Sequence, residues 1–161
     1  IPFLGICLGM QMAVIEYARN VKKIRYANST EISEKCKDPV IDLMTSQKEI
    51  INKGGTMRLG AWDCEIEKNT KSYKCYKKKL ISERHRHRYE FNNNYTDRIF
   101  DDKFVIAGSN PDTKLVEIVE NIDHPWFVGV QFHPEYKSSV YNPHPIFVNF
   151  VKASLKKYLN K

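Results

Sequence analysis

The sequence lacks several features that would assign it at once to a familiar class. Its four cysteines have no CxxC spacing, so neither a zinc site nor the disulfide framework of a small secreted domain is expected. No apolar run approaches the ~20 residues of a membrane span, and the apolar N-terminal stretch has no basic leader. Neither GxGxxG nor GxxxxGK followed by Ser or Thr occurs, which excludes the common phosphate loops. These absences predict a soluble, cytoplasmic protein with no metal site and no membrane partner.

The composition is that of a folded, basic chain. Hydrophobic residues make up 42% of the sequence and aromatic residues 12%, which indicates one compact domain over residues 1–161. The net charge is +7, and the densest basic stretch, 68–79, has Tyr73 and Tyr76 among its lysines. Such a stretch is more often a solvated insertion than a nucleic-acid site. We therefore do not expect nucleic acid as a partner.

Hydrophobic periodicity predicts an α/β fold. Helices with one apolar face are expected at 8–20 and at 145–159. Short strands, several of them antiparallel, are expected at 1–6, 40–44, 57–67, 83–91, 104–109, 115–120 and 126–132. We predict an open, three-layer arrangement in which helices flank a sheet with antiparallel additions.

A candidate nucleophile lies in the segment Gly5-Ile6-Cys7-Leu8-Gly9. After an apolar run, this pattern predicts a strand that turns sharply into a helix, with glycines where the turn leaves no room for a Cβ atom. Cys7 would then lie at a helix N-terminus, where the helix dipole favours the thiolate, the form that attacks carbonyl carbon. A lone cysteine is more often a buried apolar residue, but the glycine frame favours a nucleophile.

A candidate base lies in the segment Gln131-Phe132-His133-Pro134-Glu135. Residues i and i+2 of an extended segment point to the same side, so Glu135 can accept a hydrogen bond from one nitrogen of His133. The other nitrogen would be free to take the proton of Cys7. Nucleophile and base meet in space in such sites, so their distance in the sequence is no obstacle.

Alternating arginines suggest an anion site. Arg84, Arg86 and Arg88 would share one face of the predicted strand 83–91, with His85 and His87 on the other. Planar guanidinium groups bind carboxylates in a bidentate manner. The alternative is a cross-strand ladder of ion pairs, which we expect for at least one of the three arginines.

The elbow and the His-Pro-Glu loop resemble those of class I, triad-type glutamine amidotransferases, which hydrolyse glutamine to glutamate and ammonia and have a flavodoxin-like sheet. Further segments are similar to the glutaminase domain of the CTP synthase family, namely 7–11, 16–20, 27–31, 55–60, 83–90 and 124–127. The resemblance covers nearly the whole chain and is interrupted at 32–54 and 65–82.

The resemblance implies a role for each candidate residue. The catalytic triad would be Cys7, His133 and Glu135, and the glutamine pocket would be formed by Leu8, Gly9, Met10, Gln11, Glu31 and Arg88. Within the pocket, Glu31 would bind the substrate ammonium and Arg88 its carboxylate. The Leu8 N–H would be one oxyanion donor, and a second would come from a loop preceding the chain. Arg58 is a candidate for communication with GTP, although a surface or packing role is commoner for an arginine.

The remaining chemistry of the implied enzyme lies outside these residues. The chain begins at Ile1 inside a predicted strand, so we expect a glutaminase domain that is incomplete at its N-terminus. In the family, ammonia passes to a synthase domain of the same polypeptide, which uses ATP and Mg²⁺ to convert UTP to CTP. GTP is the allosteric activator and the assembly is a tetramer. L-glutamine is the implied substrate, and no cofactor is implied within residues 1–161.

Two other interpretations stay open. The chain could be a free-standing cysteine hydrolase of γ-glutamyl substrates, or a catalytically silent basic module that retains a fossil site. The intact Cys7, His133 and Glu135 argue against the silent module, and the resemblance of segment 83–90 argues against the hydrolase. A synthase domain encoded upstream would decide for the amidotransferase.

Overall fold

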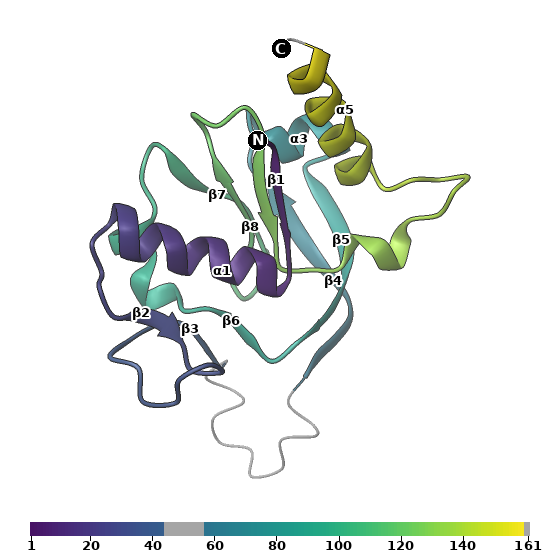
Figure 1. Cartoon of the computed structure of the whole chain (residues 1–161). Helices are drawn as coiled ribbons and strands as arrows, with labels where there is room; N and C mark the ends of the chain where they lie inside the picture. Colours follow the sequence, from purple (N-terminus) through teal and green to yellow (C-terminus); the bar gives the residue numbers. More distant parts are fainter. Residues whose placement is uncertain (44–56, 160–161) are drawn as a thin grey trace.

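The computed structural model describes residues 1–43 and 57–159 (Figure 1). Within them, six strands form a mixed sheet in the order β1-β9-β8-β7-β4-β5. These strands are β1 (Phe3–Ile6), β9 (Phe127–Val130), β8 (Val116–Asn121), β7 (Phe104–Ser109), β4 (Arg58–Ile66) and β5 (Leu80–His87). In this sheet β1 and β9 pair in parallel, and the other neighbours are antiparallel.

A smaller sheet of three strands lies beside the first. It has the order β2-β3-β6, with strands β2 (Ala27–Ser29), β3 (Asp38–Leu43) and β6 (Tyr89–Phe91). β6 follows β5 after a single residue, Arg88, so the chain leaves the large sheet at this residue and enters the small one. Arg88 therefore lies at the junction between the two sheets.

Helices cover both faces of the six-stranded sheet. The helix α1 (Leu8–Glu16) continues as the π-helical segment η1 (Tyr17–Val21) and crosses β1 in Figure 1. Val119 of β8 packs in the same cluster as α1, whereas its neighbour Ile118 packs in the cluster that contains residues of α3 (Lys71–Tyr76) and α5 (Pro145–Leu159). Successive strand residues point to opposite faces, so α1 and the pair α3 and α5 lie on opposite sides. The predicted α/β arrangement is confirmed.

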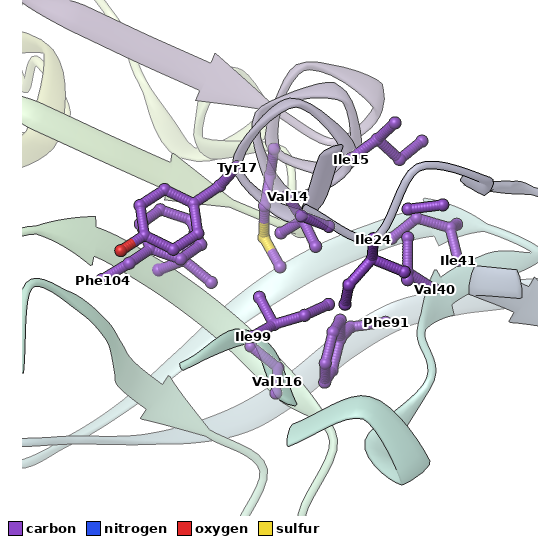
Figure 2. Close-up of a cluster of buried hydrophobic side chains, with 14 residues drawn as sticks. Val14, Ile15, Tyr17, Ile24, Val40, Ile41, Phe91, Ile99, Phe104 and Val116 are labelled. Atoms are coloured by element: carbon purple, nitrogen blue, oxygen red, sulfur yellow. The ribbon is translucent and has the colours of Figure 1, made fainter. Parts of the chain in front are cut away.

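The core on the α1 side joins the helix to both sheets. Figure 2 shows Val14 and Tyr17 of the helical segment with Ile41 and Phe91 of the small sheet and Phe104 of the large one. The rings of Tyr17 and Phe104 stack with centroids 4.3 Å apart. Short elements complete the connections, namely η3 (Asn93–Tyr95), α4 (Thr96–Ile99) and η4 (Pro134–Lys137). This packing fixes the helix and with it the position of its N-terminus.

The helix predicted at 145–159 is α5, with the same bounds. Its predicted apolar face consists of Ile146, Phe147, Phe150, Val151, Ser154, Leu155 and Tyr158. Only the first part of that face is buried, because Ile146 is fully enclosed whereas Leu155 and Tyr158 are 54% and 73% exposed. The helix is thus present as predicted, and the last turns of its apolar face stay exposed among the described residues.

The strand predictions hold with one correction. β1, β4, β7, β8 and β9 lie within about two residues of their predicted bounds, and β3 matches the strand predicted at 40–44, whose Met44 is outside the described residues. The strand predicted at 83–91 was wrong as a single strand, because β5 ends at His87 and β6 begins at Tyr89 in the other sheet. Pairing of Phe91 with Ile41 draws this end of the segment into the small sheet.

The basic stretch contains a packed helix. The buried carboxylate of Glu120 accepts the backbone N–H groups of Lys71 and Ser72 at the start of α3, each at 2.7 Å. Tyr73 and Tyr76 pack against the hydrophobic cluster that contains Ile118 and residues of α3 and α5, while the lysines after them, 77–79, are exposed. The tyrosines are thus used for packing, which leaves them poorly placed to stack on bases.

Candidate active site

The elbow between β1 and α1 presents Cys7 in a strained conformation. Cys7 has φ 50° and ψ −104°, values that non-glycine residues rarely adopt, and its N–H donates to Val130 O at 2.8 Å. A Cβ atom on Gly5 would lie 2.7 Å from the Gly9 carbonyl carbon, so Gly5 is needed for the close approach of the helix. A Cβ atom on Gly9 would meet nothing within 4 Å among the described residues, so the expectation of crowding at Gly9 was wrong there.

The surroundings of Cys7 set the ionisation of its thiol. Burial raises the pKa of Cys7, and the carboxylates of Glu31 and Glu135 add to this rise. The Leu8 N–H at the start of α1 and the side-chain amide of Gln131, 3.6 Å from Sγ, act in the opposite direction. The helix N-terminus therefore favours the thiolate as expected, but burial outweighs it. A thiol in this environment needs a base to remove its proton.

His133 lies at the sheet edge from which Cys7 also emerges. β1 and β9 are parallel neighbours with Ile6 opposite Val130, so the residues after them leave the sheet on the same side. His133 Nδ1 is 2.6 Å from Glu135 Oε1, and the His133 N–H donates to Arg84 O at 2.8 Å. A carboxylate only accepts, so Nδ1 carries the proton and Nε2 has a free lone pair. Nε2 is buried and has no hydrogen-bond partner among the described residues.

A cavity of about 200 Å³ opens beside Cys7. It brings together five of the residues that the sequence suggested, together with four that it did not assign to the pocket. Its lining consists of Cys7, Leu8, Gln11, Glu31, Met57, Arg86, His87, Arg88 and Tyr89. Of the residues missed, Arg86 and His87 had a signal in the alternation of segment 84–88, whereas Met57 and Tyr89 lay within segments 55–60 and 83–90 of the resemblance but were given no role.

Two residues of the predicted pocket lie elsewhere. Met10 is fully buried in the core, where a Cβ atom on Gly129 would lie 3.1 Å from its Cγ. Gly9 borders a second cavity, which is formed mainly by apolar residues of β1 and α1. The side chains of the helix's first turn thus diverge, and only Leu8 and Gln11 face the cavity that contains Cys7.

Two arginines of the alternating set, Arg86 and Arg88, line the cavity. Among residues 1–43 and 57–159, Arg84, Arg86 and Arg88 form no ion pair, so the expected ladder was wrong for these residues. The Arg88 Nε is buried and lacks a hydrogen-bond partner in this part of the chain. A buried donor without an acceptor costs free energy, which an arriving carboxylate would recover.

A buried ionic cluster supports the strand that carries these arginines. We give this name to Arg58, His85, His87, Glu90 and Glu117, all at most 6% exposed. Arg58 Nη2 lies 2.6 Å from Glu117 Oε1, and Arg58 Nη1 lies 3.5 Å from Glu90 Oε2. Arg58 is therefore an ion-pair partner in the interior. It does not lie on the surface, where it could contact a nucleotide.

Burial governs the protonation of this buried ionic cluster. It raises the pKa of both Glu90 and Glu117 to about 7, although the Arg58 charge opposes the rise. It also lowers the pKa of His85 to about 2 and that of His87 to about 3, and the same arginine adds to both shifts. Both imidazoles are therefore neutral at physiological pH.

The described residues contain no group of three or more acidic, His or Cys side chains arranged to hold a metal ion. In the same part of the chain, no helix has the length and apolar character that crossing a bilayer requires. All four cysteines are free thiols.

The elbow at Cys7, the His133–Glu135 pair and the α/β layers are features of a class of protein that a family comparison identifies. The family model "Glutamine amidotransferase class-I" matches residues 1–153, and the chain belongs to this family. Within the family, two curated relatives are CTP synthases. The chain is 61% identical over 154 residues to CTP synthase of Christiangramia forsetii and 62% identical over 155 residues to that of Flavobacterium johnsoniae.

These alignments cover 96% of this chain but 28% and 29% of the two relatives, so the chain spans less than a third of their length. Among solved structures, the glutaminase domain of Trypanosoma brucei CTPS, determined with bound acivicin, superposes with a TM-score of 0.89 at 39% identity. That match covers 97% of this chain and 61% of the other. The chain is thus similar to the glutaminase part of CTP synthases.

Proposed function

We propose that this chain hydrolyses L-glutamine to glutamate and ammonia through Cys7, His133 and Glu135, as the glutaminase domain of a CTP-forming enzyme. The observation that carries the proposal is the emergence of Cys7 and of the His133–Glu135 pair from the parallel neighbours β1 and β9. Similarity to CTP synthases over nearly the whole chain supports the same conclusion. We also propose that residues 1–161 belong to one such domain.

The cavity has the charges that a zwitterionic amino acid requires. Glu31 would bind the ammonium group, and Arg88, with its unpartnered Nε, would bind the α-carboxylate. Gln11 would contribute its carbonyl oxygen, because its amide nitrogen is already bonded to Tyr89 O and to Gln131. Leu8 lines the cavity, whereas Gly9 and Met10 would contribute through the main chain of the first helical turn. Paired charges also give specificity, since an analogue without one of its charges leaves a protein charge unpaired.

The proposed chemistry proceeds through a thioester. His133 Nε2 takes the proton of Cys7, and the sulfur attacks the carboxamide carbon of glutamine while the Leu8 N–H donates a hydrogen bond to the developing oxyanion. The C–N bond breaks as His133 returns the proton to the departing ammonia. His133 then activates water, which cleaves the thioester, and the sulfur recovers its proton as glutamate leaves. Glu135 orients the imidazole throughout.

The destination of the ammonia is proposed from the relatives. We infer a synthase domain in the same polypeptide that aminates UTP with the aid of ATP and Mg²⁺. GTP activation, a tetrameric assembly and a cytoplasmic location stay predictions from the resemblance. The interior position of Arg58 gives no support to its candidacy as the residue that communicates with GTP.

The test uses the full-length protein that contains this chain. Cys7→Ala should abolish glutamine-dependent CTP formation and leave synthesis from added ammonia intact, because the thiol acts only in ammonia release. Cys36→Ala, which removes another partly buried thiol, is the matched control and should leave both rates unchanged. A glutamine-like label such as diazo-oxo-norleucine should modify Cys7 alone.

Three results would contradict the proposal. An equal loss of the ammonia-dependent rate in Cys7→Ala would make Cys7 structural. Hydrolysis of γ-glutamyl peptides by a protein that forms no CTP would favour the free-standing hydrolase. Absence of both activities, with no labelling of Cys7, would favour the silent module.

A further inference from the structure

The side chain of Gln131 contacts the nucleophile from the interior of the protein. Gln131 directly follows β9, is fully buried, and donates its backbone N–H to Glu117 O at 2.8 Å. Its Nε2 lies 3.6 Å from Cys7 Sγ, within the range of a hydrogen bond to sulfur. A buried amide held by its own backbone against a reactive sulfur has little freedom to turn away.

Neighbouring contacts fix which end of the Gln131 amide faces Cys7. Gln11 Nε2 lies 2.8 Å from Tyr89 O and 3.2 Å from Gln131 Oε1. A backbone carbonyl can only accept, so the NH₂ of Gln11 must point to Tyr89 O. The second hydrogen of this NH₂ meets Gln131 Oε1, which leaves the NH₂ of Gln131 directed at Cys7. The orientation of both amides thus follows from one backbone oxygen, with no freedom to exchange oxygen and nitrogen.

The same backbone oxygen is held by the buried ionic cluster. His87 Nδ1 lies 3.1 Å from Tyr89 O and must be the protonated nitrogen, for the same reason. His87 Nε2 therefore accepts from His85 Nδ1, 2.9 Å away. Hydrogen bonds from His87 and from Gln11 converge on Tyr89 O, so this oxygen is a stable anchor for the amides.

We propose that Gln131 is a fixed hydrogen-bond donor that stabilises the Cys7 thiolate when His133 takes the proton, and that Gln11 and the Tyr89 carbonyl hold it in this orientation. The inference rests on the proposed function, in which Cys7 is the nucleophile. Gln131 contacts the reacting sulfur and is in that sense a catalytic residue. Gln11 affects the sulfur only through Gln131 and is, for this step, a positioning residue. A donor to the ionised form favours ionisation, which here opposes burial and the carboxylates of Glu31 and Glu135.

The test measures the rate of Cys7 alkylation by iodoacetamide as a function of pH in the full-length protein without glutamine, with peptide mass spectrometry to follow this cysteine alone. Gln131→Met keeps the length of the side chain but removes the donor. Its alkylation midpoint should rise by about one pH unit, a tenfold loss of thiolate below the midpoint, which is the lower end of the effect of a hydrogen bond to a charged group. Gln131→Glu replaces the donor by a carboxylate oxygen and should raise the midpoint further.

The matched control is Asn110→Leu, which removes another buried amide that bonds to Asp63 O at 2.8 Å. It should destabilise the fold without moving the alkylation midpoint of Cys7. An unchanged midpoint in Gln131→Met, or an equal shift in Asn110→Leu, would overturn the inference. If Gln131→Met fails to fold, Gln131→Glu, which has the same shape as glutamine, decides in the same way.

Failure of the proposed function gives a different result. In that case the unmodified full-length protein does not hydrolyse glutamine, whatever the alkylation profiles of the variants. Hydrolysis by the unmodified protein, together with an unchanged Gln131→Met midpoint, refutes the role of Gln131 alone.

Discussion

Replacement of Arg88 tests the proposed recognition of glutamine most directly. Arg88 lines the cavity beside Cys7, and its Nε has no partner among the described residues. Loss of one partner of a desolvated charge pair costs about 2–5 kcal/mol. Because Arg88 is only half-buried, we expect the lower part of this range for Arg88→Met, about 2–3 kcal/mol, or a fall of about 30- to 150-fold in kcat/KM for glutamine.

The assay compares two nitrogen sources in the full-length protein. In Arg88→Met, CTP formation at low glutamine concentrations should be lost, and higher concentrations should be needed to restore it. The rate with added ammonia should stay within about twofold of the parent rate, which is about the precision of such rates. The kcat/KM of Arg88→Lys for glutamine should lie between that of the parent and that of Arg88→Met, since a lysine retains the charge but cannot bind a carboxylate through two parallel hydrogen bonds.

Arg98→Ala is the control for general loss of positive charge. Arg98 is on α4, is 55% exposed and pairs with Asp38 at 3.5 Å, an arrangement that contributes little to stability. The reasoning would be refuted if Arg98→Ala raised the glutamine requirement as much as Arg88→Met. It would also be refuted if Arg88→Met reduced both nitrogen-dependent rates equally, because Arg88 would then support the fold and not the substrate.

Three further predictions concern the fold and its charges. Gly5→Ala should lower stability by about 1–3 kcal/mol, since its Cβ would overlap the helix backbone, whereas Gly9→Ala should show no such loss; thermal unfolding compares the two, and equal losses would contradict the steric argument. The lowered pKa values of the two histidines make stability fall as the pH drops below 6.5, while the raised pKa values of the two glutamates make it fall as the pH rises from 4.5 to about 7. These opposing slopes should nearly cancel between pH 5 and 6.5. Glu117→Gln removes one of the glutamates, so its unfolding temperature should fall more steeply than that of the parent as the pH drops through this range; a slope equal to that of the parent would show that this glutamate does not titrate as described. Replacement of Lys77–Lys79 by Ser should change no nucleic-acid affinity, because we expect none at physiological salt; tight, salt-sensitive RNA binding that this change abolished would give the chain a second role.

The sequence was sufficient wherever a function depends on a short local pattern. The spacing of His133 and Glu135 predicts their hydrogen bond because two residues of an extended segment determine it. The apolar period of 145–159 likewise predicts the bounds of α5. It does not predict how much of the helix is covered, since that depends on which other elements pack against it.

Interactions between distant segments could not be predicted in this way. The break at Arg88 arises because β6 pairs with β3, a strand more than forty residues earlier in the sequence. The interior position of Arg58 depends on two carboxylates that meet it from β8 and β6. Nothing in the local sequence distinguishes such an arginine from one on the surface, and the role of Gln131 depends in the same way on contacts with Gln11 and Cys7.

The segment from Arg84 to Tyr89 connects these distant groups. Its first carbonyl accepts the N–H of His133, and its last carbonyl accepts the amide of Gln11, which orients Gln131 towards Cys7. Between these two carbonyls, the histidines enter the buried ionic cluster while Arg86 and Arg88 line the cavity. The proposed base, the proposed donor to Cys7 and the arginine proposed to bind the substrate carboxylate are therefore fixed to one short stretch of backbone. A displacement of this stretch would move all three together.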